Sequence, residues 1–264
     1  MLRNKHIVVM GGTAGIGLSA ARAFIRQGAR VVVVGRSAAS AGKARQELGG
    51  SALVLEGDAA REGTAEQAIA LCCEQWGSFD GLYHVAGGSG RKMGDGPLHE
   101  ITLEGWQQTL ELNLTSVMLS NRAAVRVFLK VGKGGVILNT GSALGNSPVP
   151  QYFSTHAYAA AKAAIVGFSR SLAACYARDN IRVNVLAPAL VETAMSRRAA
   201  GDAAIMDYIR TKQPLDGGRI GSPGDLDGAA CYFMSDLSAF TTGQVLSVDG
   251  GWAVSEGTVQ AKVK

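Results

Sequence analysis

The 264-residue sequence has few cysteines, few prolines and no long apolar run, and each shortage excludes a class of protein. No apolar run approaches the roughly 18 residues of a transmembrane helix, and the stretch before the first glycines is too short for a signal peptide. Six prolines and no G-x-y period exclude collagen, although glycine reaches 35 residues. The four cysteines lack C-x-x-C spacing and lie at Cys72, Cys73, Cys175 and Cys231. We therefore expect a cytoplasmic protein with no metal site and no membrane partner.

Charge is also sparse, since 26 Lys and Arg against 21 Asp and Glu give a formal net charge of +5. The basic residues are scattered, with no block longer than two, so we expect no nucleic-acid partner. Hydrophobic residues make up 47% of the chain, which fits a globular protein with a sizeable core. Acidic residues are absent from one long stretch, Leu18 to Gln46.

Short apolar runs alternate with stretches of helical periodicity along the whole chain. A continuous β-branched run such as Arg30–Val34 is typical of a parallel strand covered on both faces. The expected strands are His6–Met10, Arg30–Val34, Ser51–Leu55, Gly81–Ala86, Gly135–Thr140, Arg182–Ala187 and Val245–Val248. The expected helices cover about 16–27, 61–76, 104–130 and 157–178. This alternation predicts one α/β domain over residues 1–264, with a doubly wound, mostly parallel sheet.

The first expected strand runs into a glycine-rich turn, residues 11–17, and then into a helix. Backbone N–H groups and a helix N-terminus at such a turn attract an anion. Gly11 allows the tight turn, Gly15 lets the backbone approach a pyrophosphate, and Gly17 lets the helix pack on the strand. A purely structural turn is the alternative, but the strand before and the helix after favour a dinucleotide cofactor.

The end of the second strand indicates which dinucleotide binds. NAD sites commonly place an Asp or Glu about 20 residues after the glycines, where it binds the ribose 2′-OH. Here Arg36 and Ser37 follow the strand, and no acid precedes Glu47. A positively charged side chain attracts the 2′-phosphate of NADP, whereas a carboxylate would repel it. We therefore predict NADP as the preferred cofactor, with NAD as the alternative.

Tyr158 and Lys162 lie four residues apart in an alanine-rich stretch with helical character. Side chains at i and i+4 share one helix face, so the ammonium can lie beside the phenol. A neighbouring cation favours the phenolate, which makes Tyr158 a plausible general acid/base for a carbonyl or alcohol oxygen. The Y-x-x-x-K spacing alone is common by chance.

Six motifs in order resemble those of the short-chain dehydrogenase/reductase family, over about residues 5–252, with 3-oxoacyl-[acyl-carrier-protein] reductases among the similar members. The matching segments are Met10–Gly17, Leu112–Leu114, Asn139–Gly145, Tyr158–Lys162, Asn184–Thr193 and Thr242–Gly251. The resemblance implies a Rossmann-type sheet flanked by helices and an NAD(P)-dependent oxidoreductase that interconverts a ketone and a secondary alcohol. A scaffold or dinucleotide sensor of the same fold that has lost the chemistry is the alternative.

The resemblance also implies roles for individual residues. Ser142 would bind the substrate oxygen and Tyr158 would exchange the proton. Lys162 would bind the nicotinamide ribose and lower the Tyr158 pKa, while Asn113 would hold a water that connects Lys162 to solvent. The implied cofactor-binding residues are Gly11, Thr13, Gly15, Ile16, Gly17, Arg36, Ser37, Asp58, Ala59, Ala86, Gly87, Tyr158, Lys162, Pro188, Val191 and Thr193.

The chain departs from the family pattern at three places. His84 and Val85 replace two asparagines, and we interpret His84 as structural rather than catalytic. Ala189 replaces a glycine after Pro188. The spacing between Ser142 and Tyr158 is about three residues longer than the family suggests, so we expect residues 146–156 to shape the substrate pocket.

The substrate side of the site is less defined by sequence. Residues 194–215 resemble the family's mobile lid, and residues 253–264 are expected to form a flexible tail. Four basic residues suit an anionic substrate, but we favour solvated surface for them: Arg91, Lys92, Arg197 and Arg198. We predict a small carbonyl or alcohol substrate. By resemblance, we expect a homotetramer or dimer assembled through the long helices near 104–130 and 157–178, with Trp252 at a second interface.

Overall fold

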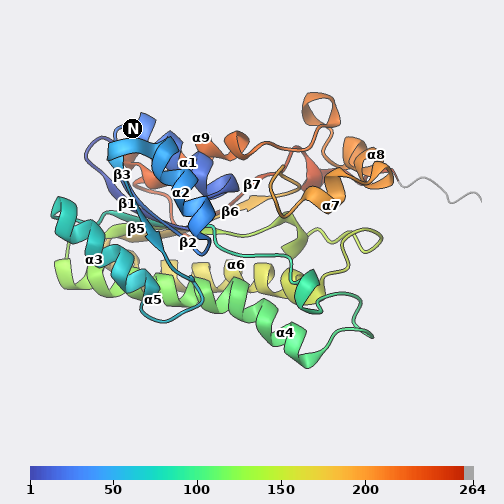
Figure 1. Cartoon of the computed structure of the whole chain (residues 1–264), viewed down its shortest axis with the longest axis horizontal. Helices are drawn as coiled ribbons and strands as arrows, with labels where there is room; N and C mark the ends of the chain where they lie inside the picture. Colours follow the sequence, from blue (N-terminus) through green and yellow to red (C-terminus); the bar gives the residue numbers. More distant parts are fainter. Residues whose placement is uncertain (259–264) are drawn as a thin grey trace, which may run out of the picture.

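Seven parallel strands form the centre of the structure, a computed structural model that describes residues 1–258 (Figure 1). They are β1 (His6–Met10), β2 (Arg30–Gly35), β3 (Ala52–Glu56), β4 (Gly81–His84), β5 (Gly135–Thr140), β6 (Ile181–Pro188) and β7 (Val245–Val248). Their spatial order is β3-β2-β1-β4-β5-β6-β7. This order confirms the predicted doubly wound, Rossmann-type sheet.

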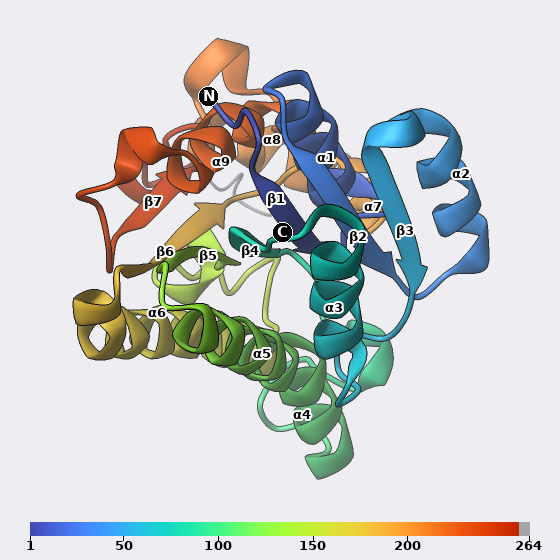
Figure 2. The ribbon, with the colours of Figure 1, turned by 90° about the vertical axis from the view of Figure 1, so that its left-hand side faces the viewer.

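Helices cover both faces of the sheet. They are α1 (Gly15–Arg26), α2 (Ala38–Leu48), α3 (Thr64–Trp76), α4 (Leu103–Leu110), α5 (Ser116–Val131), α6 (His156–Tyr176), α7 (Arg197–Ala200), α8 (Ala203–Lys212) and α9 (Asp227–Met234). Figure 2 shows α1 and α9 on one face and α3, α5 and α6 on the other. The short helices α7 and α8 lie at the right-hand end of Figure 1.

The β-branched run of β2 is buried on both sides, as predicted. Val31 and Val33 pack into the core between the sheet and α1, together with Phe24. Val32 and Val34 point to the opposite core, beneath α3 and α5. Successive side chains of a strand alternate between faces, so a strand covered on both sides needs an apolar residue at every position.

The long helix predicted over 104–130 is interrupted. Residues Glu111–Thr115 form a π-helical turn between α4 and α5. One extra residue per turn changes the direction of the side chains that follow, and such turns are frequent at functional sites. Asn113, a predicted site residue, lies in this turn.

Several helices were not predicted from the sequence, namely α2, α7, α8 and α9. In α2 only three residues are buried, so its apolar pattern is weak. Ser37 caps its N-terminus, since the Ser37 side chain accepts a hydrogen bond from Ser40 N. The predicted strands agree with the structure within one or two residues, which is the usual uncertainty of element ends.

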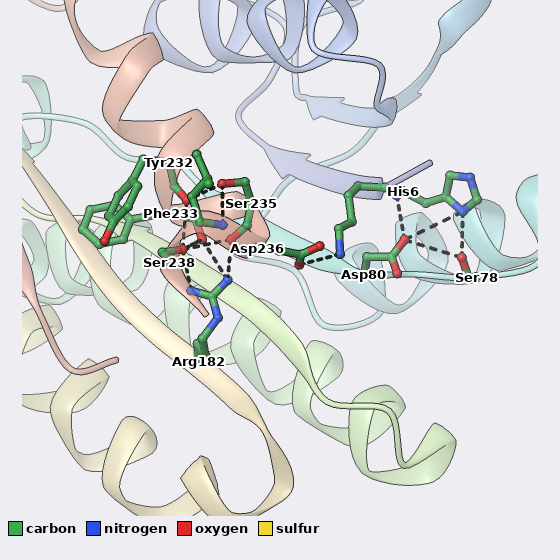
Figure 3. A network of polar contacts seen from close by, with 11 residues as sticks. His6, Ser78, Asp80, Arg182, Tyr232, Phe233, Ser235, Asp236 and Ser238 are labelled. Carbon is green, nitrogen blue, oxygen red and sulfur yellow. Dashed lines mark hydrogen bonds and ion pairs between the residues drawn. The ribbon is translucent and has the colours of Figure 1, made fainter. Parts of the chain in front are cut away.

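Polar contacts stabilise the amino ends of β1 and β6, at the opposite edge of the sheet from the glycine-rich turn (Figure 3). The Arg182 guanidinium donates to the backbone oxygens of Phe233 and Ser235, at 3.2 and 3.1 Å, at the C-terminal end of α9. The Asp80 carboxylate accepts a 2.7 Å hydrogen bond from the backbone N–H of His6. These bonds satisfy carbonyls and N–H groups that the elements leave unpaired at their ends.

The described part of the C-terminal segment contacts α8. Lys212 Nζ donates to the backbone oxygen of Ser255, and Thr258 N donates to Thr211 Oγ1 at 2.6 Å. Of the tail predicted over 253–264, residues 259–264 lie outside the described residues. Between residues 1 and 258, no helix combines the length and apolar character needed to cross a membrane.

Candidate active site

The carboxyl ends of β1, β4, β5 and β6 open into one pocket of about 970 Å³. It lies beside the point between β1 and β4 where the strand order reverses, the usual ligand site of open α/β sheets. The predicted residues that line it are Gly11, Thr13, Gly15, Ile16, Arg36, Ser37, Asp58, Ala59, Ala86, Gly87, Ser142, Tyr158, Lys162, Pro188, Val191 and Thr193.

The glycine-rich turn fits a dinucleotide phosphate. Gly11 has φ +82°, and a Cβ there would lie 2.6 Å from the Ala86 nitrogen. A Cβ on Gly17 would lie 2.2 Å from the Gly11 oxygen, so Gly17 serves helix packing and does not line the pocket. Gly15 opens α1 on the pocket wall with φ +52°. The N–H groups at the start of α1 are therefore available to an anion in the pocket.

Arg36 and Ser37 line the adjoining end of the pocket, after β2. Arg22 pairs with Glu47 and Arg45 with Glu56, whereas Arg36 forms no ion pair with any residue from 1 to 258. Arg36 is exposed, so its guanidinium can meet a phosphate that enters the pocket.

Tyr158 and Lys162 lie on α6 with the Lys162 ammonium 5.6 Å from the centre of the Tyr158 ring. Lys162 is buried and donates a 2.9 Å hydrogen bond to the Thr140 oxygen. Burial lowers the pKa of Lys162 to about 8, so it remains mostly protonated at neutral pH. Burial raises the pKa of Tyr158, opposite to the direction expected from the sequence, because desolvation of the phenolate outweighs the hydrogen bond from Ser142.

Ser142 follows β5 and meets Tyr158 in the pocket. A hydrogen bond from Ser142 acts to lower the pKa of Tyr158, against the larger effect of burial. The Ser142 backbone is extended at φ −164°, and its Oγ also accepts a 3.2 Å hydrogen bond from Leu144 N. Ser142, Tyr158 and Lys162 thus converge from β5 and α6.

Asn113 is fully buried and does not line the pocket. Its Oδ1 accepts a 3.0 Å hydrogen bond from Gly88 N, and its Nδ2 donates to the Gly88 oxygen at 2.8 Å. A Cβ on Gly87 would lie 2.7 Å from Asn113 Oδ1 and 3.5 Å from Lys162 Nζ. The π-helical turn therefore places Asn113 where it holds the chain after β4 close to Lys162.

Sequence reasoning missed Asp95, a buried carboxylate at the N-terminus of α6. Its Oδ1 accepts a 3.0 Å hydrogen bond from Ala157 N, and its Oδ2 accepts a 2.9 Å bond from Tyr158 N. A carboxylate at a helix N-terminus pairs free N–H groups and interacts well with the helix dipole. An ordinary N-cap residue adjoins its helix in sequence, whereas Asp95 lies 63 residues from Tyr158.

Comparison with known proteins agrees with this geometry. A family model described as enoyl-(acyl carrier protein) reductase matches residues 11–253. The 2,5-dichloro-2,5-cyclohexadiene-1,4-diol dehydrogenase of Sphingobium indicum is 32% identical over 252 residues, which are 95% of this chain and 98% of that protein. The chain belongs to the short-chain dehydrogenase/reductase family.

Solved structures of this family superimpose along nearly the whole chain. A short-chain type dehydrogenase/reductase from Mycobacterium ulcerans is 28% identical with a TM-score of 0.88, covering 97% of this chain and 92% of its own. A 3-ketoacyl-(acyl-carrier-protein) reductase from Brucella melitensis, in complex with NADH, is 28% identical with a TM-score of 0.84, covering 96% of this chain and 100% of its own. The chain is thus an oxidoreductase of the short-chain dehydrogenase/reductase family.

His84, one departure from the short-chain dehydrogenase/reductase pattern, is buried behind the site. Its Nδ1 lies 2.7 Å from Ser120 Oγ, and its Nε2 lies 3.1 Å from the Ala86 oxygen. Burial and the charge of Lys162 lower the pKa of His84 to about 3, so the ring is neutral at physiological pH. Because His84 does not line the pocket, its contacts fit the predicted structural role.

The substrate side of this dehydrogenase/reductase differs from expectation in two respects. Three of the four basic residues predicted to be solvated surface are exposed as predicted, and Arg91 is partly buried. All four nevertheless line the pocket, because the turn after β4 and helix α7 bring them there: Arg91, Lys92, Arg197 and Arg198. Trp252, expected at a subunit interface, is buried and donates a 3.1 Å hydrogen bond to the Ser147 oxygen. It packs in a core that the long 146–156 segment and α8 share.

Part of the lid predicted over 194–215 adjoins the pocket. Residues 194–199, which include the start of α7, line the wall. The segment 146–156 also contributes to the wall, through Phe153 and Thr155. Within residues 1–258, no group of three or more His, Cys, Asp or Glu side chains is arranged to hold a metal ion.

Proposed function

We propose that the protein is an NADP-preferring oxidoreductase that interconverts a ketone and a secondary alcohol, with Tyr158 as general acid/base. The convergence of Ser142, Tyr158 and Lys162 on one wall of the pocket carries this proposal. These side chains come from β5 and α6, at the same edge of the sheet as the glycine-rich turn. The name of the Sphingobium relative, a diol dehydrogenase, supports chemistry on an alcohol.

Each of the three side chains has a distinct role in the proposed reduction. A nicotinamide held in the pocket would supply the hydride for the carbonyl carbon. Ser142 donates a hydrogen bond to the carbonyl oxygen and Tyr158 transfers its phenolic proton to that oxygen, so the product is the alcohol and the tyrosine becomes a phenolate. Lys162, held by the Thr140 oxygen, offers a positive charge beside that phenolate.

A tyrosine with a raised pKa suits the acid role. A phenol that holds its proton at neutral pH is ready to donate it, and negative charge on the reacting oxygen makes that transfer favourable. Oxidation of an alcohol needs the phenolate instead. We therefore expect oxidation to become faster as pH rises, up to the point where Lys162, with a pKa of about 8, loses its charge.

The dinucleotide would lie across the glycine-rich turn. The start of α1 would hold the pyrophosphate, and Arg36 with Ser37 would hold the 2′-phosphate of NADP. Asp58 and Ala59 would lie beside the adenine, while Ala86, Gly87, Pro188, Val191 and Thr193 would line the path toward the nicotinamide. The NADH complex of the Brucella relative keeps NAD as the alternative.

Replacement of Tyr158 by Phe tests the proposal. The variant keeps the ring but loses the proton donor, so we expect kcat to fall about 10²–10⁴-fold. Its NADPH affinity, measured by the fluorescence of the reduced cofactor, should change little.

Turnover of the wild type is screened with ketones and NADPH or NADH. A wild-type protein that binds cofactor but reduces no ketone and oxidises no alcohol would support the alternative of a sensor or scaffold.

A further inference from the structure

Four basic side chains at one end of the pocket have no anionic partner among residues 1–258. They are Arg91, Lys92, Arg197 and Arg198. The acidic residue on the pocket wall is Asp58, which lies after β3. The carboxylate of Asp95 acts on Arg91 electrostatically but forms no ion pair with it, and both its oxygens accept hydrogen bonds from α6. One carboxylate beside four cations leaves this end of the pocket with a net positive charge.

Two of these cations, Arg91 and Arg198, meet at one neutral oxygen. The backbone oxygen of Tyr152 accepts a 3.2 Å hydrogen bond from Arg91 and a 3.1 Å bond from Arg198. Burial and the charge of Arg198 lower the pKa of Arg91, against a smaller opposing effect of Asp95. A guanidinium has five N–H donors, and each arginine uses one of them on the Tyr152 oxygen. Most N–H groups of both side chains are therefore available to another acceptor.

The surface beside the two arginines is apolar. The Arg198 guanidinium lies 5.9 Å from the centre of the Phe153 ring, which helps to hold it against the wall. Leu144, Phe153 and Met195 line the same pocket as Ser142 and Tyr158. The pocket thus offers a hydrogen-bonding group for a carbonyl oxygen, an apolar wall, and two cations.

We propose that Arg91 and Arg198 bind the anionic end of the substrate, so that the enzyme acts on a ketone or secondary alcohol that carries a carboxylate. The proposal rests on the oxidoreductase function argued above. A carboxylate accepts hydrogen bonds from both guanidiniums and neutralises the charge that the Tyr152 oxygen leaves uncompensated. The apolar wall accommodates the carbon chain between the carboxylate and the reacting carbonyl.

The test compares oxo acids with their methyl esters. Rates are measured for the series from 3-oxobutanoate to 7-oxooctanoate and for the matching esters, which have the same ketone but no charge. We expect kcat/KM for at least one acid to exceed that of its ester about tenfold or more, consistent with charge-assisted hydrogen bonds. Equal kcat/KM for every acid and its ester would overturn the proposal.

The variants Arg91→Gln and Arg198→Gln locate the effect. Each should raise KM for the preferred acid about tenfold and leave the methyl ester within about twofold. Arg3→Gln is the matched control, because Arg3 is an exposed residue before β1 that does not line the pocket. A loss shared equally by acid and ester, or seen equally with the control, would contradict an anion subsite.

A binding measurement separates this proposal from the oxidoreductase function. Calorimetric titration with hexanoate and with methyl hexanoate needs no turnover. Hexanoate binding that disappears in the Arg91→Gln, Arg198→Gln double variant supports the anion subsite, even if no ketone is reduced. Absence of hexanoate binding, or binding unchanged in the double variant, counts against the subsite even if ketones are reduced.

Discussion

The buried carboxylate of Asp95 accepts a 2.9 Å hydrogen bond from the backbone N–H of Tyr158. Its other oxygen binds the adjacent N–H, of Ala157, at 3.0 Å. This pair ties the loop after β4 to the first turn of α6, the turn that carries the proposed general acid. Since that turn is fixed from outside the helix, the position of the phenol depends on a residue far away in the sequence.

The variant Asp95→Asn tests this dependence. An asparagine side chain offers one oxygen acceptor, and its NH₂ group would face the second N–H. We expect a loss of about 1–3 kcal/mol in the free energy of unfolding and a fall of about tenfold in kcat as the Tyr158 turn shifts. Urea unfolding and steady-state kinetics measure the two effects.

Asp202→Ala provides the control for Asp95→Asn, because alanine removes a helix cap that asparagine would keep. Asp202 caps α8 in the same manner, since its Oδ1 accepts hydrogen bonds from Ala204 N and Ile205 N. It does not line the pocket. Loss of this cap should cost stability while kcat remains unchanged. An Asp95→Asn protein with full kcat would show that Asp95 does not position Tyr158.

The buried His84 predicts a dependence of stability on pH. Its folded-state pKa of about 3 lies below the ordinary value of 6.5, so the unfolded chain binds the proton first as pH falls. The free energy of unfolding should therefore decrease below pH 6.5, by up to about 1.4 kcal/mol for each pH unit until pH 3 is reached. The contribution is complete above pH 6.5.

Urea unfolding at pH 7.5 and pH 5.5 measures the effect of His84. Replacement by Asn removes the titrating group, so the variant should lose about 1.4 kcal/mol less than the wild type between these two pH values. The control is His99→Asn, since the His99 side chain is 81% exposed. If His84→Asn loses as much stability as the wild type, acid sensitivity has another source.

Arg36 should determine cofactor preference. We expect the wild type to bind NADPH more tightly than NADH, and Arg36→Ala to weaken NADPH about 10–100-fold while NADH changes less than about twofold. Arg30→Ala is the matched control, because Arg30 is an exposed arginine at the opposite end of β2. Fluorescence titration of the three proteins with each cofactor measures the six affinities. Tighter NADH binding by the wild type would refute the assignment of NADP.

Assembly into a tetramer remains a prediction from the family. The exposed face of α6 consists largely of small residues, which would let two helices approach closely: Ala160, Ala163, Ala164, Gly167, Ser171 and Ala174. We expect light scattering to give about four times the chain mass of 27.3 kDa, and Ala164→Glu to lower that mass by placing charge in the interface. A monomeric mass for the wild type at micromolar concentration would exclude the assembly.

Features that depend on neighbouring residues were predictable. The β-branched run of β2 and the glycine-rich turn each specify a local conformation, and the structure contains both as predicted. The i, i+4 spacing of Tyr158 and Lys162 brings the two side chains together on α6. In contrast, the weakly patterned α2 was missed, since little of it is buried and packing against β3 stabilises it more than its own periodicity.

The sequence by itself determined the order of the strands, the glycine-rich turn and the pairing of Tyr158 with Lys162, because periodicity, glycine geometry and helical spacing act over a few residues. Ser142 was assigned through the resemblance to the family. Only the tertiary structure decided the direction of the Tyr158 pKa shift, since burial depends on every surrounding element. It also decided the contact of Asp95 with α6 and the convergence of Arg91 with Arg198, which lie more than a hundred positions apart. Contacts between residues so far apart in the sequence form because the parallel strands place their carboxyl ends at one edge of the sheet. This alignment results from packing of the whole domain, and no local pattern encodes it.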